Sequence, residues 1–555
     1  MDNNIISLVL FSIRVFLSFL SVVIITLCFK SMRNHTRRNG ALIILQNAYT
    51  KKEYPVLFWE NSIGRSKNCD IVIPDSTISR DHAVLFRRKN GWFISDTNSK
   101  YGVLVNGKKI KDKTKLNIND TISLGATTLN LLKASDSRDI SSNYEPSINI
   151  SSPLNPSRNL FLVTLFLILN GSEPILQSQS ISLYKTGPLV IFILLSWLFF
   201  IISTLILKRR TFELETLAIF LSGIGITLIS NAKPDEAFMQ LLTTAIGMVL
   251  FCVIIGIIKN PDIAGKMQIM IAILAVGLFI VNLIFAKEIN GAKNWITLAS
   301  FSIQPSEFIK IAFIFVGAST LDDLQTTKSL TWFILFSSIC IGCLFLMKDF
   351  GTACIFFVAF LVIAFMRSGS IRTLILSCSA AALGVFLILT FKPYIKDRFS
   401  VWGNVWEHAN ELGFQQTRVL AYSASGGLFG VGVGNGCLKN VFASIGDLMF
   451  GVVCEEMGLI VAITIALILA GFSFSAHSQT SKSRSTFYSI SSCAAASMLI
   501  FQAALHIFGT TDILPLTGVT LPFVSLGGSS MISSFGLLAF IKAADERTYA
   551  LKKTY

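Results

Sequence analysis

The chain of 555 residues is 52% hydrophobic and only 14% charged, whereas soluble domains average about 25% charged residues. This composition excludes an ordinary soluble protein, because apolar runs recur that are long enough to cross a hydrocarbon core of about 30 Å. The net charge of +15 would suit a nucleic-acid-binding protein, but Lys and Arg collect at the ends of the apolar runs, as in Lys208-Arg209-Arg210. The positive-inside rule expects them there. We therefore expect a multi-span membrane protein that binds no nucleic acid.

The first apolar run extends from Ile5 to Phe29. It is too long for a signal-peptide core and lacks a small-residue cleavage site, so residues 1–30 are interpreted as an uncleaved transmembrane anchor. Arg14 lies inside this run, and its long side chain is expected to snorkel to the polar interface. The basic flank predicts that the following domain is cytoplasmic; it consists of Lys30, Arg33, Arg37 and Arg38.

Residues 41–132 differ completely from this anchor. Short runs rich in β-branched and aromatic residues (ALIIL, YPVLFW, DIVI, AVLFRR, WFIS) alternate with turn signals such as Lys89-Asn90-Gly91. This pattern predicts a small all-β sandwich built from hairpins. The Ser, Asn and Pro residues of 133–157 predict a flexible linker.

The chain becomes apolar again from residue 158. Residues 158–210 are assigned to accessory transmembrane helices, 211–545 to a transmembrane core and 546–555 to a cytoplasmic tail. Spans are predicted near 159–178, 186–207, 213–232, 238–258, 268–286, 306–319, 331–347, 350–366, 373–391, 448–472, 487–508 and 526–543. With the N terminus outside, the outer loops are about 287–305, 392–447 and 509–525. Chemistry is expected in the long loop, because long loops in compact domains are commonly functional.

Within 62–131, short motifs follow in a fixed order: Gly64-Arg65, Ser79-Arg80-Asp81-His82 and Asp96…Ser99…Gly102…Asn106-Gly107. On these motifs the segment resembles a forkhead-associated (FHA) domain. The resemblance implies that a phosphothreonine binds to Arg65, Ser79, Arg80 and Lys100 and that His82 braces the loop. Arg and Ser suit this role because they donate strong hydrogen bonds to phosphate. Tyr101 stands where the family has a peptide-gripping Asn, so docking of a protein without phosphate stays open.

A second set of ordered motifs covers residues 213–545. They include Asn290-Gly291-Ala292-Lys293-Asn294-Trp295-Ile296, Gln304-Pro305-Ser306-Glu307 with Lys310 one turn on, Asp349-Phe350-Gly351-Thr352, Gly413-Phe414-Gln415, Asp447-Leu448-Met449-Phe450, Glu455-Glu456 and Pro515…Thr517-Gly518…Gly527-Gly528-Ser529-Ser530. On these motifs the segment resembles the SEDS family of FtsW, RodA and SpoVE. The expected fold is a polytopic α-helical membrane bundle, a ten-span SEDS core with about three extra N-terminal spans, and an inserted cytoplasmic FHA sandwich.

This resemblance implies a peptidoglycan glycosyltransferase that polymerises lipid II with inversion and releases undecaprenyl diphosphate. Asp447 takes the position of the family's essential aspartate and is expected to act as general base. The residues themselves also support a functional role for Asp447. Acidic side chains near the outer span ends are few, and ionisable groups at a membrane boundary are costly. Binding or supporting roles are expected for Lys293, Trp295, Glu307, Lys310, Asp349, Gln415, Arg418, Glu455 and Ser529. Glu307 and Lys310 can pair on one helix face, and the glycine run 426–434 favours close packing over a phosphate cradle.

The expected partners are lipid II, a class B penicillin-binding transpeptidase, a phosphothreonine-bearing protein and a Ser/Thr kinase pathway. The expected location is the bacterial plasma membrane, with the FHA domain cytoplasmic and the catalytic loop extracellular. No cofactor is assigned, and a divalent cation, Mg²⁺ or Mn²⁺, stays open. Two alternatives also stay open: a flippase for lipid-linked precursors and a non-catalytic division scaffold. Family positions depart from the usual pattern at Lys348, Gly446, His506 and Leu526.

Overall fold

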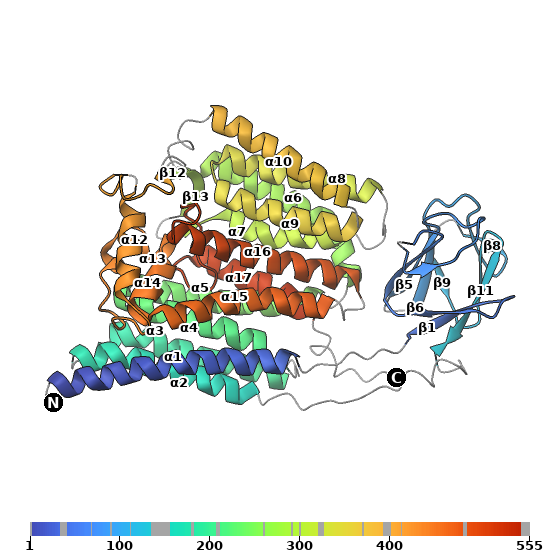
Figure 1. Cartoon of the computed structure of the whole chain (residues 1–555). Helices are drawn as coiled ribbons and strands as arrows, with labels where there is room; N and C mark the ends of the chain where they lie inside the picture. Colours follow the sequence, from blue (N-terminus) through green and yellow to red (C-terminus); the bar gives the residue numbers. More distant parts are fainter. Residues whose placement is uncertain are drawn as a thin grey trace.

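The computed structural model describes most of the chain. The described ranges are 3–33, 41–67, 69–88, 91–110, 113–134, 156–178, 182–206, 211–258, 261–289, 292–298, 301–319, 327–368, 371–391, 401–411, 413–480 and 485–544. The predicted linker 133–157 and the predicted tail 546–555 fall almost wholly outside these ranges. Within them, a β-sandwich lies beside a large bundle of helices (Figure 1).

The sandwich consists of two sheets of antiparallel strands, apart from one parallel pair between β3 and β4. One sheet has the order β2-β1-β11-β10-β7-β8, and the other has the order β4-β3-β5-β6-β9. The strands are β1 (Ile43–Asn47), β2 (Glu53–Val56), β3 (Glu60–Gly64), β4 (Ile71–Val72), β5 (Ala83–Arg88), β6 (Gly91–Asp96), β7 (Val103–Val105), β8 (Lys108–Lys109), β9 (Thr114–Leu116), β10 (Thr121–Leu124) and β11 (Thr127–Lys133).

Alternation along the strands builds the core of the sandwich. In β11, Thr127, Leu129 and Leu131 are buried while the residues between them are half-buried, as expected when successive side chains point to opposite faces. Leu45 of β1 lies opposite Leu131 in the register. These inward residues form an apolar cluster separate from that of the helices. The predicted all-β sandwich is confirmed.

The helical bundle begins with three helices that precede the core: α1 (Asn3–Arg33), α2 (Pro156–Ser178) and α3 (Leu183–Ile201), the last continued by a π-helical turn, η2 (Ile202–Ile206). The remaining long helices are α4 (Glu213–Ala232), α5 (Pro234–Ile258), α6 (Pro261–Phe285), α7 (Pro305–Ala318), α8 (Thr327–Leu346), α9 (Phe350–Ser368), α10 (Ile371–Phe391), α15 (Leu459–Thr480), α16 (Thr486–Thr510) and α17 (Gly528–Ala543). Because α1, α2 and α3 pack around α4, the most apolar window of α4 is completely buried.

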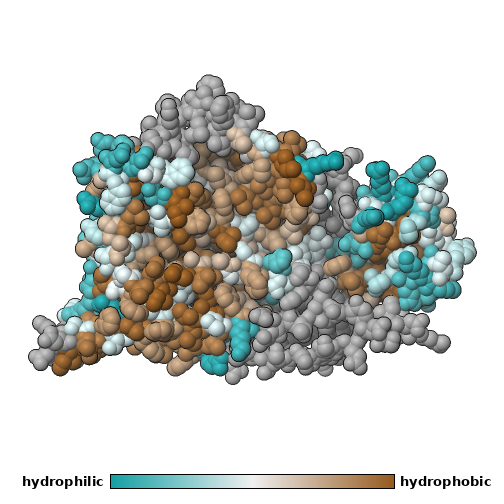
Figure 2. Space-filling view, viewed as in Figure 1, coloured by the Kyte–Doolittle hydropathy of each residue, from teal (hydrophilic) through white to brown (hydrophobic). Residues whose placement is uncertain are grey.

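The surface of the bundle has the hydropathy of a membrane protein. Figure 2 shows apolar side chains covering the helices, while polar side chains gather on the sandwich and at the opposite end of the bundle. Among the described residues, nine helices are long and apolar enough to cross a membrane: α1 to α6, α9, α15 and α16. The predicted membrane bundle is therefore confirmed in kind, while its exact number of spans stays a prediction.

Shorter elements gather at the end of the bundle away from the sandwich (Figure 1). We call this the loop end and define it by residues 287–303, 401–447 and 511–527. It contains the strands β12 (Lys287–Ile289), β13 (Ala292–Leu298) and β14 (Phe301–Ile303), and the short helices α12 (Phe414–Ser425), η3 (Leu438–Asn440) and α13 (Ser444–Asp447). The predicted outer loops thus lie together, and part of the first folds as a three-stranded sheet.

One predicted span is broken in the structure, and another corresponds to a short helix. The span predicted at 448–472 is interrupted at Gly458 (φ 86°), which separates α14 (Met449–Met457) from α15. A Cβ at Gly458 would lie 2.4 Å from the carbonyl oxygen of Leu428, so the break brings two backbones into contact. The span predicted at 306–319 corresponds to α7, whose 14 residues give a helix of about 21 Å, shorter than a hydrocarbon core of about 30 Å.

The sandwich contacts the bundle at the start of α16. The carboxylate of Glu60 accepts the backbone N–H of Thr486 at 3.0 Å. The ring of Trp59 lies edge-on to that of Tyr488, with centroids 6.3 Å apart, and packs against the apolar core of the helices. Glu60 begins β3, whereas Gly64 ends it next to Arg65, so the docking contact and the predicted phosphothreonine site lie at opposite ends of one strand.

Candidate functional site

Asp447 ends the short helix α13 at the loop end, and its side chain is half-buried. Its backbone N–H donates to the carbonyl of Ala443 at 2.8 Å. A Cβ built on Gly518, a residue with φ 70°, would lie 3.6 Å from the Oδ2 of Asp447. The aspartate therefore faces the Thr517-Gly518 turn, so motifs about 70 positions apart in the sequence meet at this carboxylate.

The backbone around Asp447 is held by residues that follow α16. Ser525 Oγ donates to the carbonyl oxygen of Gly446 at 2.7 Å, and the N–H of Leu526 donates to the carbonyl of Ile445 at 3.0 Å. These two hydrogen bonds fix the main chain immediately before the aspartate. The motif that contains this segment does not by itself indicate such a role for Ser525.

His506 of α16 reaches the other side of the same segment. Its Nε2 lies 3.2 Å from the backbone nitrogen of Phe450, whose N–H it accepts, and its Nδ1 lies 2.7 Å from the carbonyl oxygen of Val519. The ring is 1% exposed. In the sequence His506 is only a departure from the family pattern, whereas the structure places it between the aspartate segment and the turn that faces it.

Asp349, at the start of α9, is the centre of a second group of predicted residues. Its Oδ2 accepts hydrogen bonds at 3.1 Å from the side chains of Asn294 and Gln304, and its Oδ1 accepts the N–H of Thr352 at 3.1 Å. Ser529 Oγ accepts the backbone N–H of Gln304 at 3.1 Å. A carboxylate with three donors orients its neighbours and serves as a positioning group.

Glu307 and Lys310 form the predicted ion pair inside the bundle, with Nζ and Oε1 2.8 Å apart. Lys310 is 0% exposed and also donates to Gln502 of α16 at 2.8 Å, while the second oxygen of Glu307 accepts from Ser533 of α17 at 2.5 Å. Buried charges need such partners, because an unpaired charge in this environment is strongly destabilising. The pair connects α7, α16 and α17.

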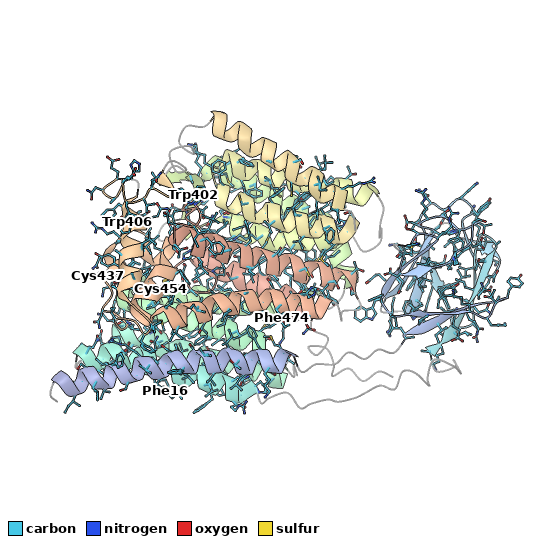
Figure 3. All side chains as sticks on the ribbon, viewed as in Figure 1. Phe16, Trp402, Trp406, Cys437, Cys454 and Phe474 are labelled. Carbon is cyan, nitrogen blue, oxygen red and sulfur yellow. The ribbon has the colours of Figure 1, made fainter. Side chains whose placement is uncertain are left out.

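Other predicted residues also lie at the loop end. Gln415 of α12 donates to the carbonyl of Phe442 at 2.9 Å, and Arg418 is exposed with its guanidinium 5.2 Å from the ring of Phe414. Lys293 of β13 is exposed and Trp295 of β13 is half-buried. Figure 3 places the side chains of Trp402 and Trp406 in the same region.

The surroundings of Glu455 indicate that it stabilises the fold of the loop. It is 2% exposed, and its carboxylate accepts the N–H groups of Cys437 at 2.7 Å and Leu438 at 2.9 Å. The glycine run beside it packs closely, as predicted: a Cβ at Gly426 would lie 2.1 Å from the carbonyl oxygen of Cys454. Glu455 therefore anchors the loop that leads to Asp447.

The four predicted phosphothreonine-binding residues come together on one edge of the sandwich. The backbone N–H of Arg65 donates to the carbonyl of Ser79, and the N–H of Lys100 donates to Ser79 Oγ, both at 3.0 Å. Arg65, Arg80 and Lys100 are exposed. The Nζ of Lys100 lies 5.5 Å from the ring centroid of Tyr101, which is 51% exposed. Three cations on three adjacent loops can receive a phosphate dianion.

Two buried residues hold this edge in shape. A Cβ at Gly64 would lie 2.1 Å from the carbonyl oxygen of Arg80, so only glycine allows the loops to approach. His82 is fully buried, accepts the N–H of Ser79 at 3.0 Å and lies 3.1 Å from the carbonyl oxygen of Gly102. This is the bracing role expected for His82.

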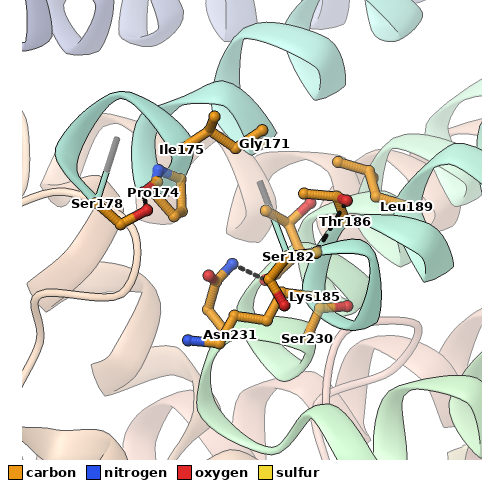
Figure 4. A pocket seen from close by; sticks show the side chains of 11 residues that line it. Gly171, Pro174, Ile175, Ser178, Ser182, Lys185, Thr186, Leu189, Ser230 and Asn231 are labelled. Atoms are coloured by element: carbon orange, nitrogen blue, oxygen red, sulfur yellow. Dashed lines mark hydrogen bonds between the residues drawn. The ribbon is translucent and has the colours of Figure 1, made fainter. Parts of the chain in front are cut away.

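The described residues contain neither a metal-binding cluster nor, in the cavity between α2, α3 and α4, any of the predicted site residues. Within the described ranges, no three His, Cys, Asp or Glu side chains converge as metal ligands, and we assign no residue to Mg²⁺ or Mn²⁺. A cavity of about 130 Å³ lies between α2, α3 and α4, and its lining shares no residue with the predicted sites (Figure 4).

Comparison with known proteins identifies both parts. The sequence profile of the FtsW/RodA/SpoVE family, described as cell cycle protein, matches residues 217–549, and that of the FHA domain matches residues 61–125. The chain is 24% identical over 433 residues to the peptidoglycan glycosyltransferase RodA of Mycobacterium leprae, covering 72% of this chain and 92% of the relative. It is 31% identical over 259 residues to the probable peptidoglycan glycosyltransferase FtsW of Coxiella burnetii, covering 45% of this chain and 70% of the relative.

A solved structure shares the fold of the helical part. A chain of a peptidoglycan synthase complex, reported for its coordination of polymerization and crosslinking, superposes with a TM-score of 0.51 at 22% identity, covering 61% of this chain and 98% of that chain. The helices α1 to α3 precede the residues that the family profile matches. This protein belongs to the FtsW/RodA/SpoVE family of cell cycle proteins and carries an FHA domain between its first and second helices.

Proposed function

We propose that this protein is a peptidoglycan glycosyltransferase that polymerises lipid II at the loop end of its helical bundle. The observation that carries the proposal is the placement of Asp447. Its carboxylate faces the Gly518 turn, while Ser525 and His506 hold the backbone on either side of it. Relatives of the FtsW and RodA kind, named as peptidoglycan glycosyltransferases, support the same reaction.

The reaction needs a base because a sugar hydroxyl is a weak nucleophile. In the proposed mechanism, the free hydroxyl of one lipid-linked disaccharide attacks the anomeric carbon of a second one. Asp447 accepts the hydroxyl proton as the new C–O bond forms. The bond from the anomeric carbon to the diphosphate oxygen breaks, and undecaprenyl diphosphate leaves with that electron pair. Direct displacement inverts the anomeric centre and needs no covalent enzyme intermediate.

Basic side chains of the loop end are suited to the departing diphosphate. Lys293 and Arg418 are exposed there, and cations placed where negative charge develops stabilise the transition state. Lys439, by contrast, donates to the carbonyl of Gly434 and helps to hold the loop. Glu307, Lys310 and Asp349 are given supporting roles, because their partners are other side chains and backbone groups of the bundle.

The FHA domain is proposed to recruit a phosphothreonine-bearing protein through Arg65, Ser79, Arg80 and Lys100, downstream of a Ser/Thr kinase. It lies at the opposite end of the bundle from Asp447. This arrangement supports a cytoplasmic FHA domain and an extracellular catalytic loop in the bacterial plasma membrane. A class B penicillin-binding transpeptidase is the proposed partner that crosslinks the product, in keeping with the synthase complex whose chain shares this fold.

The test is polymerisation of purified lipid II by the full chain together with its candidate transpeptidase. Glycan strands are separated by gel electrophoresis, and undecaprenyl diphosphate is measured as the second product. Strands and diphosphate that appear in a fixed ratio support the proposal. Lipid II that crosses the bilayer of proteoliposomes without forming strands would instead support the flippase.

A further inference from the structure

Arg14 and Glu173 form an ion pair between two helices that precede the family core. Arg14 lies in the middle of α1 and Glu173 near the end of α2, and their Nε and Oε1 atoms are 2.8 Å apart. The side chain of Arg14 is 16% exposed and that of Glu173 is 2% exposed. Charges in such apolar helices are costly and indicate a function. Glu173 gives the guanidinium of Arg14 a charged partner on a neighbouring helix.

Both members of the pair also hold the backbone of residues 430–434, which we call the glycine segment. The Oε2 of Glu173 accepts the N–H of Val433 at 3.0 Å, and Arg14 Nη1 lies 3.4 Å from the carbonyl oxygen of Gly430. Gly432 has φ 102°, and a Cβ there would lie 2.2 Å from Arg14 Nη2. The glycine segment is thus shaped around the guanidinium.

Separate hydrogen bonds hold the chain at several points between the glycine segment and Asp447. The N–H of Gly434 donates to Glu456 at 2.8 Å, and Glu455 then accepts two N–H groups of residues 437–438. Ser444 Oγ donates to the carbonyl of Lys439 at 3.3 Å, at the start of the turn that ends in Asp447. The accessory helices are therefore joined to the catalytic loop by contacts that the core alone does not contain.

We infer that Arg14 and Glu173 are positioning residues for the glycosyltransferase, which hold the 430–447 loop so that Asp447 is correctly placed. This inference rests on the proposed function. The pair acts through the glycine segment and does not touch the substrate. Small displacements of a catalytic group can lower a rate by about 100-fold, so loss of the pair lowers kcat, while KM stays close to that of the wild type.

The experiment combines steady-state polymerisation with hydrogen exchange of the full chain in detergent or nanodiscs. Arg14→Ala and Glu173→Ala are expected to lower kcat by about tenfold or more and to speed amide exchange within residues 430–447. Glu173→Gln retains an acceptor for Val433 and is expected to have a smaller effect. Exchanging the two charges, Arg14→Glu with Glu173→Arg, restores opposite charges but leaves the N–H of Val433 without an acceptor, so its exchange stays fast.

The matched control is Lys233→Ala. Lys233 forms an ion pair with Glu236 at 3.0 Å, but both side chains are about half exposed where α4 ends and α5 begins. Its loss is expected to leave kcat, KM and exchange of the 430–447 loop unchanged. Arg14→Lys is the control for a general folding defect. Its ammonium group can still pair with Glu173 but does not reach the carbonyl oxygen of Gly430.

The inference would be overturned if two results were found together for Arg14→Ala and Glu173→Ala. Amide exchange in the 430–447 loop would be unchanged, and kcat would stay within about twofold of the wild type. Exchange that rises equally throughout the bundle would overturn it too, because the pair would then hold the whole fold. If the wild-type protein polymerises nothing, the proposed function fails by itself. Loop exchange in the same variants then still decides whether the pair positions residues 430–447.

Discussion

The carboxylate of Glu60 in the FHA sandwich accepts the backbone N–H of Thr486, the first residue of α16, at 3.0 Å. The same helix carries Gln502, which contacts Lys310, and His506, which contacts the segment of Asp447. One helix of 25 residues therefore connects the FHA domain to the proposed catalytic site. The FHA domain is docked on the polymerase rather than only tethered to it.

Removal of the Glu60 carboxylate is predicted to loosen this docking. A carboxylate at a helix N terminus contributes about 0.5–2 kcal/mol through the cap and the helix dipole. Glu60→Ala is expected to speed hydrogen exchange at the start of α16, measured in a peptide that contains Thr486. Glu53→Ala, on strand β2, is the control. Equal exchange in the wild type and in Glu60→Ala would show that the contact does not hold the domain.

Phosphothreonine binding is predicted to depend on the exposed cations of the FHA edge. Hydrogen bonds to charged groups contribute about 1.5–3 kcal/mol. Arg65→Ala or Arg80→Ala should therefore lower the affinity for a phosphothreonine peptide by about tenfold or more. Lys115→Ala is a charge-matched control, because Lys115 is exposed on β9, near the end of β6 away from Ser99. Calorimetry measures the affinity of each variant for the phosphorylated and the unphosphorylated peptide. Equal affinity for the two peptides would favour docking without phosphate.

The buried pair of Glu307 and Lys310 is predicted to matter for stability as a unit. Lys310→Ala leaves a carboxylate uncompensated inside the bundle, which costs about 3–5 kcal/mol. The double variant Lys310→Met with Glu307→Gln removes both charges and should recover most of the loss in Tm, measured by thermal unfolding in detergent. A double variant that is less stable than Lys310→Ala alone would contradict this reading.

The reactivity of the Cys69 thiol provides a test of the FHA fold. Burial, followed by the nearby Asp81 carboxylate, raises the pKa of Cys69 to about 12. At pH 8 only about one thiol in ten thousand is then ionised, and the thiolate is the species that reacts. Iodoacetamide at pH 8 should modify the exposed Cys437 and spare Cys69 until the domain unfolds. Equal labelling of the two in the folded protein would show that Cys69 is not in this environment.

Local patterns allowed much of this architecture to be predicted. Apolar runs located the helices, since a span needs about 20 apolar residues wherever it packs. Alternating β-branched runs located the sandwich. The ordered motifs predicted that Arg65, Ser79, Arg80 and Lys100 form one binding site. The pairing of Glu307 with Lys310 followed from their spacing of three on one helix.

Contacts between distant segments could not be predicted in this way. Arg14 and Glu173 are 159 positions apart, and nothing in either local sequence selects the partner. The break at Gly458 depends on the close approach of Leu428 from another segment. His506 appeared only as an unusual residue, because its two hydrogen bonds join loops that meet after folding.

The catalytic role of Asp447 is tested most directly by comparing Asp447→Asn with the wild type in polymerisation of lipid II. The substitution keeps the size of the side chain and removes the base, and a positioned base contributes about 10²–10⁴-fold. Glu411→Gln is the control, because this carboxylate is exposed in the same long loop. We expect Asp447→Asn to remain folded and to lose at least about 100-fold in rate, while Glu411→Gln stays within about twofold of the wild type. A folded Asp447→Asn protein that polymerises as fast as the wild type would contradict the assignment of Asp447 as the base.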